Sequence, residues 1–187
     1  MKGMMVLALL TAFAGLTHPA MGGMASRPSL PHEGKMKLES SDFAQGSIIP
    51  QRYTCGGENV SPHLEWGDAP AGTKSFALIV DDPDAPAGIW VHWLLYNIPG
   101  ERRGLPENIE AMPKLDDGIL QGRNDFGKTG YGGPCPPHGH GPHRYVFKLY
   151  ALDDELELAP GARKAALERA MQGHVLAQAE IMGRYER

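Results

Sequence analysis

The amino-acid sequence predicts a mostly β, α+β domain, and three observations support this fold class. Glycine (24 residues) and proline (16) together exceed a fifth of the 187-residue chain without forming a repeat, which is typical of a turn-dense, strand-rich fold. Apolar runs of strand length occupy the middle of the chain, whereas strong helix formers gather only near the C-terminus. Strands first and helices last favour an all-β or α+β domain over an alternating parallel sheet.

Four segments are predicted to form strands. Residues 35–43 alternate weakly, and residues 75–81 (SFALIVD) form a nearly continuous apolar run, which is typical of a strand buried on both faces. Residues 90–98 (WVHWLLYNI) are rich in aromatic and branched side chains and stop at a Pro-Gly pair. Residues 143–152 (HRYVFKLYAL) alternate most clearly and are the strongest β candidate.

Short helices are predicted at the C-terminal end. Residues 162–172 (ARKAALERAMQ) consist mostly of strong helix formers, and Gly173 interrupts them. Apolar residues from Ala166 to Leu176 roughly keep the three-to-four-residue spacing of a buried stripe. Residues 174–185 (HVLAQAEIMGRY) are therefore predicted to form a second helix.

Length and charge limit the classes of function. A chain of 187 residues with ordinary apolar and charged fractions fits one soluble globular domain. The formal net charge of −4 argues against a partner held by bulk electrostatics, such as nucleic acid or an anionic membrane.

The N-terminus is predicted to be a signal peptide. Lys2 precedes an apolar run at residues 4–16, and small residues follow, with possible cleavage after Gly22 or Ala25. The apolar run is shorter than the about 20 residues that span a bilayer, so a retained membrane anchor is the weaker alternative. We expect a signal peptide at residues 1–25, a linker at residues 26–35 and one domain at residues 36–187, in a protein that is periplasmic or secreted and has no transmembrane anchor after processing.

Cys55 and Cys135 are the only two cysteines. In an oxidising compartment an even count favours a disulfide. Closing a loop of about 80 residues would stabilise the fold by ~4–5 kcal/mol in the chain-entropy model. Two separate thiols are the alternative, because the sequence does not show whether the two Cα atoms approach within bonding range.

Residues 122–129 (GRNDFGKT) match the formula of a nucleotide-binding P-loop. The mechanism also needs a helix that begins at the lysine, so that its N-terminus faces the phosphates. Residues 130–137 (GYGGPCPP) cannot continue such a helix. We interpret the match as accidental and expect no nucleotide cofactor.

His138, His140 and His143 lie close to Cys135, and such a cluster could supply zinc or copper ligands. Proline and glycine punctuate the run, so the side chains need not converge. His143 begins a predicted strand, whereas the other two are expected on a solvated loop. We therefore expect no metal site.

Residues 81–86 (DDPDAP) place three carboxylates within four residues at the end of a predicted buried strand. One interpretation is a polar turn in which the carboxylates cap backbone N–H groups. The other is that one or two of them face inward and orient a histidine, which fixes its tautomer and favours its protonated form. His92, mid-strand between Val91 and Trp93, is the candidate, although a lone histidine there is usually a satisfied core residue.

Residues 131–134 (YGGP) could also contribute to a site. Successive glycines allow backbone N–H groups to converge into an anion-binding nest. The alternative, a flexible turn, is the better interpretation of this segment alone.

Together these segments resemble the phosphatidylethanolamine-binding protein family, also called Raf kinase inhibitor-like proteins, and closely its bacterial and archaeal YbhB/YbcL branch. The motifs that carry the resemblance are residues 53–66 (YTCGGENVSPHLEW), 81–86, 90–99, 124–153 and 173–187. Order and spacing agree from about residue 36 to the C-terminus. The usual YTCDG is YTCGG here, so one acid is missing at Gly56, and ligand preference would differ if that acid shapes the pocket rim.

The resemblance implies a compact fold of two antiparallel sheets with short C-terminal helices. It implies a pocket for a small anion, such as phosphate or a phosphorylated head group, with no cofactor and no catalytic residue. In that pocket His92 or His143, kept protonated by Asp82, would donate a charge-assisted hydrogen bond to a phosphate oxygen. The motifs that contain Cys55 and Cys135 favour their being neighbours. The ligand-binding residues so implied are Asp82, Asp84, Pro86, His92, Gly133, Cys135, Pro136, His143 and Tyr145.

Two main classes of function fit this resemblance, and a purely structural interaction protein with a vestigial pocket is a third alternative. The first is a binding or inhibitor module whose surface engages a protein, such as a protease or a kinase. The second is a hydrolase that uses Asp82, His92 and His143, with Cys135 as nucleophile. The sequence has no Gly-x-Ser-x-Gly nucleophile elbow, and a disulfide would silence Cys135. We therefore favour the binding module.

Overall fold

The computed structural model describes residues 35–187. The predicted signal peptide (1–25) and nearly all of the predicted linker (26–35) lie outside the described residues. Within residues 35–187, no helix is both long and apolar enough to cross a bilayer.

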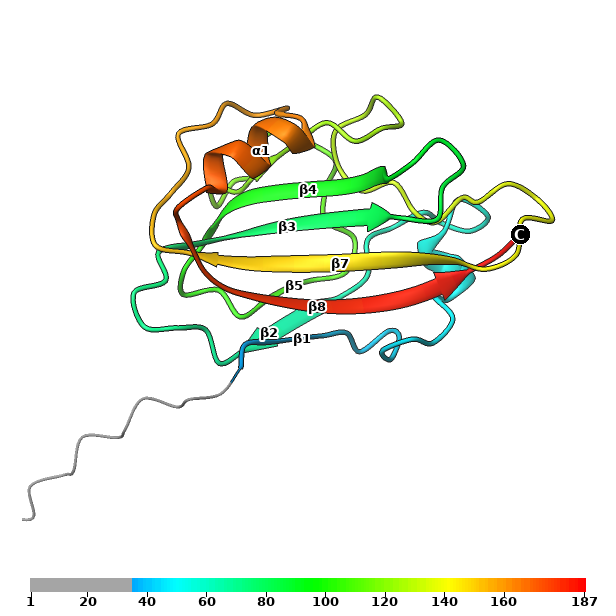
Figure 1. Ribbon diagram of the computed structural model, residues 1–187, viewed down its shortest axis with the longest axis horizontal. Coiled ribbons are helices and arrows are strands. Elements are labelled where there is room, and N and C mark those ends of the chain that lie inside the picture. The colour runs from blue at the N-terminus through cyan, green and yellow to red at the C-terminus, as the bar shows by residue number, and fades with distance from the viewer. Residues whose placement is uncertain (1–34) are drawn as a thin grey trace, which may run out of the picture. The chain divides into compact units, whose positions relative to one another are not determined.

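Two antiparallel sheets form the described part of the chain (Figure 1), which confirms the mostly β fold class. The larger sheet has the strand order β6-β4-β3-β7-β8, and the smaller has the order β1-β2-β5. One helix, α1 (Lys164–Met171), and one short 3₁₀ turn, Gln51–Tyr53, complete the regular elements of this part. The strands are β1 (Lys37–Glu39), β2 (Leu64–Gly67), β3 (Ser75–Asp82), β4 (Trp90–Pro99), β5 (Gly104–Leu105), β6 (Leu120–Gln121), β7 (His143–Leu152) and β8 (Val175–Tyr185).

The three central strands lie where the sequence predicts them. Strand β3 is buried along its whole length, as expected of a continuous apolar run in the middle of a sheet. Strand β7 alternates between buried and partly exposed residues over most of its length. The predicted strand at residues 35–43 is much shorter, since β1 spans three residues only.

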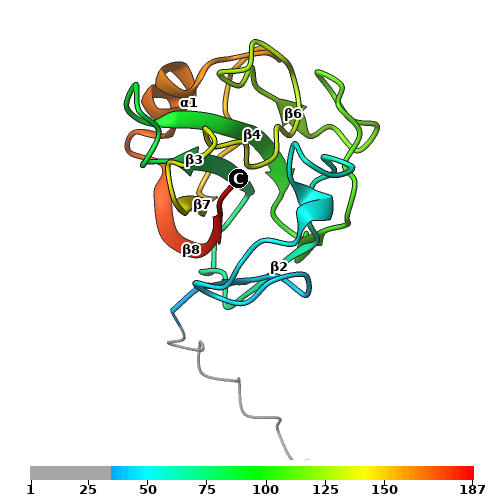
Figure 2. The same ribbon diagram turned by 90° about the vertical axis from the view of Figure 1, so that its right-hand side faces the viewer.

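Two hydrophobic layers enclose the larger sheet. On its inner face Phe76 and Leu78 pack in the core shared with the smaller sheet, where the Trp66 ring lies 5.3 Å from the Phe76 ring. On its outer face Ile79 packs in a second cluster with Leu167 of α1. Figure 2 shows α1 beside the larger sheet and away from β2. Each fully buried aliphatic or aromatic side chain contributes about 1.5–3 kcal/mol, so burial on both faces of this sheet stabilises the fold.

The prediction of a second C-terminal helix is wrong, because this segment forms strand β8. Helix α1 ends at Met171, and Gly173 adopts a positive φ of 85° that turns the chain. Strand β8 then pairs with β7 over its whole length. Its alanines suggested a helix by local propensity, but the unpaired N–H and C=O groups of β7 require a partner, and this tertiary demand overrides propensity.

Candidate functional site

A pocket of about 270 Å³ lies where β3 ends and where β4 and β7 begin. Antiparallel pairing places Asp82 opposite Trp90, and Asp81 opposite Val146. The C-terminal end of β3 therefore lies beside the N-terminal ends of β4 and β7, at one end of the larger sheet. Figure 2 faces this end of the sheet. The pocket is lined by Asp82, Ala85, Pro86, Ala87, Trp90, His92, Phe126, Cys135, Pro136, Pro137 and His143.

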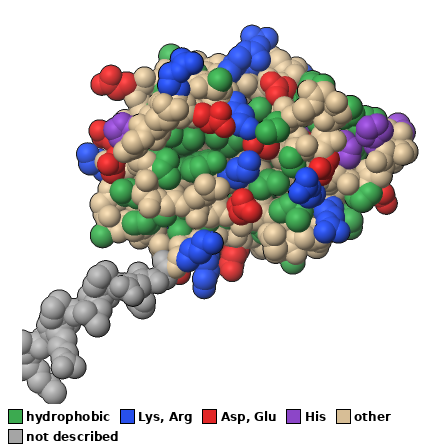
Figure 3. Space-filling view, in the orientation of Figure 1, with side chains coloured by type: hydrophobic (Ala, Val, Ile, Leu, Met, Phe, Trp, Pro, Cys, Tyr) green, Lys and Arg blue, Asp and Glu red, His purple; other side chains and the backbone are tan. Residues whose placement is uncertain are grey.

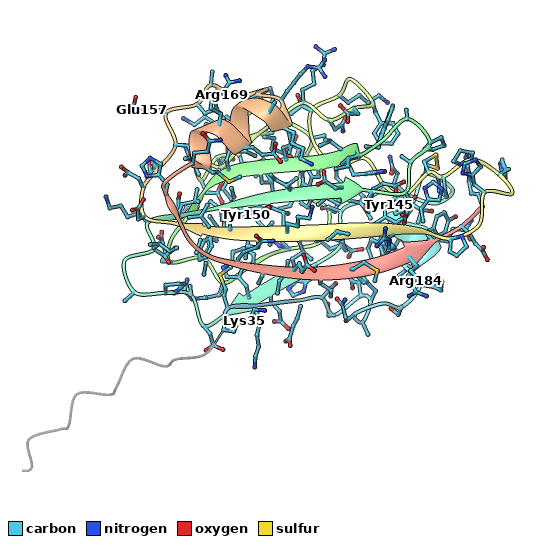
Figure 4. The ribbon with its side chains drawn as sticks, in the orientation of Figure 1. Lys35, Tyr145, Tyr150, Glu157, Arg169 and Arg184 are labelled. Carbon is cyan, nitrogen blue, oxygen red and sulfur yellow. A yellow bond between two sulfur atoms is a disulfide. The ribbon has the colours of Figure 1, made fainter. Side chains whose placement is uncertain are left out.

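Strand alternation aims Asp82 and His143 toward the same space. Asp82 has the parity of Leu78 on β3, whose side chain packs in the core between the sheets. His143 has the parity of Tyr145 and Phe147 on β7, which belong to the same core. Figure 4 labels Tyr145 at this end of β7 and Tyr150 farther along the strand. Because side chains alternate between the two faces of a strand, the side chains on the core-facing sides of β3 and β7 also face the pocket.

A β-bulge brings His92 to the pocket. Val80 pairs with Trp93, whereas the next residue, Asp81, pairs with Val91, so His92 is the extra residue on β4. Strict alternation would place His92 and Trp93 on opposite faces. With the bulge, Trp93 packs in the core between the sheets while His92 lines the pocket.

Asp82 orients His143. The His143 Nδ1–H donates to Asp82 Oδ2 over 2.8 Å, and both side chains are almost completely buried. The other oxygen, Asp82 Oδ1, accepts the Asp84 backbone N–H over 2.8 Å. A carboxylate that receives the Nδ1–H leaves only Nε2 of His143 for other partners. The predicted pairing of an inward carboxylate with a histidine therefore exists, with His143 as the histidine.

His92 does not form such a hydrogen bond with Asp82. Its Nδ1–H donates to the Gly132 carbonyl oxygen over 2.5 Å. Burial lowers the pKa of His92 below its ordinary value, because desolvation disfavours the charged ring more than the nearby carboxylates favour it. Of the two histidines predicted as alternatives for the partner of Asp82, His143 forms this pair and His92 bonds a backbone carbonyl group instead. The His92 ring packs edge-on against Tyr145 and Phe126.

The remaining two carboxylates of residues 81–86 point away from the pocket. Asp84, a predicted ligand residue, does not line the pocket and instead forms a two-pronged ion pair with Arg144, with N–O distances of 2.8 and 2.7 Å. These hydrogen bonds lower the pKa of Asp84 to about 2. Asp81 faces the other side of the sheet, where Lys148 and Lys164 donate to its Oδ2.

Three further positions singled out in the sequence lie outside the pocket lining. The Gly133 N–H donates to Asn59 Oδ1, so this amide is not free for an anion. Tyr145 is buried and packs edge-on against the His92 ring. Gly56, where the branch usually has an acid, is exposed and does not contact the pocket.

The other wall of the pocket is held by a disulfide. Cys135 is bonded to Cys55, with their Cα atoms 5.4 Å apart. The Cys55 N–H donates to the Pro134 carbonyl oxygen, and Arg187 Nε donates to that of Pro136. Pro136 and Cys135 line the pocket, as does Pro86 on the opposite side. In this bonded state Cys135 is not a thiolate nucleophile.

Trp90 and Phe126 are pocket residues that the sequence reasoning missed. The Trp90 Nε1–H is buried without a hydrogen-bond partner, and the indole packs edge-on against the Phe126 ring. Phe126 belongs to residues 122–129, the accidental P-loop match, which forms a turn closed by the pairing of Arg123 with Thr129. The position of Trp90, two residues before His92, was the available signal; nothing in the sequence pointed to Phe126.

The histidine-rich loop reaches the pocket through one contact. His138 and His140 are exposed, as predicted. The Nδ1 atom of His140 lies 3.4 Å from the Nε2 atom of His143. Within residues 35–187, no group of three or more histidine, cysteine, aspartate or glutamate side chains is placed to hold a metal ion.

Comparisons with known proteins identify the family of this chain. A family profile described as phosphatidylethanolamine-binding protein matches residues 39–186. A UPF0098 protein of Aquifex aeolicus is 54% identical over 153 residues, which cover 81% of this chain and 89% of that protein. The UPF0098 protein YbhB of Escherichia coli is 45% identical over 154 residues, which cover 78% and 97%.

Solved structures give the same result. The crystal structure of Escherichia coli YbcL, described as a member of the mammalian PEBP family, has a TM-score of 0.76 and 37% identity over 82% of this chain and 99% of YbcL. A homologue of phosphatidylethanolamine-binding protein from Chlamydia trachomatis has a TM-score of 0.75 and 41% identity over 82% and 98%. These findings confirm the resemblance that the motifs indicated.

Proposed function

The chain belongs to the phosphatidylethanolamine-binding protein family, and from this premise we propose that its pocket binds a small anion, such as phosphate or a phosphorylated head group. Membership of this family supports a binding protein in general. The observation that carries the finer proposal is the buried pair of Asp82 and His143, which lines the same pocket as Trp90.

The charges at the pocket support an anion only if His143 is protonated. Ionised Asp82 alone would repel a negative ligand in this poorly solvated space. When His143 takes up a proton at Nε2, the pair with Asp82 becomes neutral overall and Nε2–H becomes a charge-assisted donor. We propose the Nε1–H of Trp90 as a second donor, because it has no hydrogen-bond partner and belongs to a residue that lines the pocket.

The size and walls of the pocket favour a small ligand. A volume of about 270 Å³ lies below the ~300–1,000 Å³ that is usual for pockets of drug-sized ligands. Most of the lining is apolar, through alanine, proline and aromatic side chains. We therefore propose a phosphate-sized head with at most a short substituent against the apolar wall.

Contact with a protein, such as an inhibited protease, is a second proposed role. Ile89 is 58% exposed and Phe126 is 39% exposed, and these apolar side chains lie in or beside segments that line the pocket. Exposed apolar residues around a cleft are typical of interaction sites. If residues 1–25 act as a signal peptide, the partner is extracytoplasmic, and N-terminal sequencing of the mature protein tests the export.

Phosphate and phosphoethanolamine titrations, followed by the NMR signals of the histidine rings, test the anion proposal. We expect the His143 ring signals to shift at up to millimolar ligand. Asp82→Asn should weaken anion binding at least tenfold, because the neutral amide cannot stabilise the positive charge of protonated His143. Asp84→Asn is the matched control and should bind within about twofold of wild type, since Asp84 bonds Arg144 outside the pocket. Unchanged His143 signals in the wild type would refute the proposal.

The proposal also states that the pocket binds without catalysis. The disulfide removes the candidate nucleophile Cys135, and we expect no turnover in a screen of esters and phosphoesters. Hydrolysis that disappears in His143→Ala would favour the hydrolase alternative instead.

A further inference from the structure

We propose that His140 determines the affinity and pH dependence of anion binding, because it occupies the same ring nitrogen of His143 that an anion would use. In this arrangement an anion must displace His140, and a proton must be added to His143. The inference rests on the proposed anion-binding function of the pocket.

The hydrogen-bond roles follow from the contacts of His143. Its Nδ1–H donates to Asp82, so in the neutral ring Nε2 carries a lone pair. His140 Nδ1 lies 3.4 Å from this atom, and the two ring centroids are 5.6 Å apart. The neutral pair is therefore consistent only with His140 Nδ1–H as donor and His143 Nε2 as acceptor. In that neutral pair the lone pair at Nε2 would repel an anion, so His143 can donate to an anion only after Nε2 takes up a proton.

His140 can leave without disturbing the core. It is exposed and lies between Gly139 and Gly141, whose φ angles of 75° and 79° form a turn at the surface. Figure 3 shows histidine side chains gathered at this end of the described part. His143, in contrast, is fixed by burial and by Asp82. Displacement therefore moves His140 and leaves His143 in place.

Each bound anion then takes one proton from solvent. The proton adds to His143 Nε2, the new N–H donates to the anion, and ionised Asp82 balances the charge of the ring. Two other groups near the pocket are less suited to these roles: Asp84 is already paired with Arg144, and burial lowers the pKa of His92. Titratable or charged groups in and beside the pocket include Asp82, Asp84, His92, His140, Arg144, Tyr145, Tyr185 and Arg187.

Sulfate titrations by calorimetry between pH 5.5 and 8.5 test the inference, since the charge of sulfate is constant over this range. Wild type, His140→Ala and the control His138→Ala are compared, the control being an exposed histidine on the same loop. At pH 8 we expect His140→Ala to bind sulfate about two- to tenfold more tightly than wild type, the range that one net hydrogen bond supplies. His138→Ala should match the wild type.

Proton uptake is measured in the same experiment from buffers of different ionisation enthalpy. We expect about one proton per sulfate at pH 8, and affinity that falls as pH rises. Nitrogen-15 spectra of the free protein give a readout without ligand: the His143 Nε2 signal should be that of an unprotonated acceptor, and His140→Ala should shift it.

The outcomes separate the two proposals. Equal sulfate affinity of wild type and His140→Ala at pH 8, or binding without proton uptake, would overturn the role of His140 while leaving anion binding intact. A protonated His143 Nε2 in the free protein at pH 8 would also overturn it. Absence of sulfate binding in all three proteins at every pH would refute the proposed function, and this inference with it.

Discussion

At the scale of single residues, the ion pair between Asp84 and Arg144 makes the free energy of unfolding depend on pH. The pKa of Asp84 is lowered to about 2, mainly by hydrogen bonds from Arg144. A carboxyl whose pKa is depressed in the folded state stabilises the fold above its unfolded value of about 4. This contribution is lost as pH falls from about 4 to about 2.

We therefore expect Asp84→Asn to be less stable than wild type by about 1 kcal/mol at pH 6, a value discounted for partial exposure, and by almost nothing near pH 2. Urea unfolding at both pH values measures the difference. Asp116→Asn, at an exposed position, is the control and should change little at either pH. An equal loss at both pH values would show that the charge of Asp84 is not the cause.

His92 also makes stability depend on pH, through burial of its ring and not through an ion pair. Burial depresses its pKa, so below the ordinary histidine value of about 6.5 the unfolded chain binds a proton that the folded protein does not. The wild type should therefore lose stability as pH falls from 7.5 to 5.5. In His92→Gln this part of the pH dependence should disappear, although the variant is less stable overall. Unfolding free energies of the two proteins that fall in parallel would contradict this prediction, and His138→Gln provides the exposed-histidine control.

At the scale of elements, the contact between residues 131–137 and the segment after the 3₁₀ turn shapes one wall of the pocket. Gly133 has no room for a side chain: an added Cβ would collide with the Tyr53 carbonyl oxygen and lie 2.6 Å from Asn59 Oδ1 and 2.9 Å from the Thr54 Cα. Two of these atoms belong to backbone, which cannot turn aside as a flexible side chain can.

Gly133→Ala should consequently destabilise the fold by ~1–3 kcal/mol, the usual range for overpacking, and weaken anion binding because Cys135 and Pro136 shift with the segment. Thermal unfolding and sulfate titration measure the two effects. Gly67→Ala is the matched control, because a Cβ there meets no atom within 4 Å. Similar losses in both variants would mean that the contact of Gly133 is unimportant.

Strand β8 shows how an element can differ from its local sequence preference. Ala177, Ala179 and Gly183 are small residues that fit a helix or a strand, and the sequence suggested a helix. Gly183 is needed where the strand passes Ile49, since an added Cβ would lie 2.8 Å from the Ile49 Cδ1. This requirement comes from a segment more than 130 residues away in the chain, so no local pattern could reveal it.

At the scale of the described part of the molecule, the disulfide joins two segments that are 80 residues apart. Replacing both cysteines with serine should lower the unfolding free energy by ~2–5 kcal/mol, because the unfolded chain regains the freedom of a long loop. Thermal unfolding with and without reductant measures this effect. Reductant should destabilise the wild type and leave the double variant unchanged; a wild type insensitive to complete reduction would contradict the prediction.

Removal of the disulfide should also weaken sulfate binding, because Cys135 lies in the pocket wall. The loss of sulfate affinity measures how far the disulfide supports the pocket wall, whereas the unfolding free energy measures its contribution to stability. A double variant that remains folded at the temperature of the titration and binds sulfate as the wild type does would show that the remaining contacts of residues 131–137 are sufficient.

The sequence by itself determined the mostly β class, the three central strands, helix α1 and the family, because these depend on local periodicity, on strong breakers and on ordered motifs. It also indicated that an inward carboxylate would orient a histidine. The tertiary structure alone decided which histidine that is, since a bulge in β4 and the register of β3 with β7 place His143, and not His92, against Asp82. It also turned Asp84 toward Arg144 and formed β8 as a strand, because hydrogen-bond partners, unlike periodicity, come from distant parts of the chain.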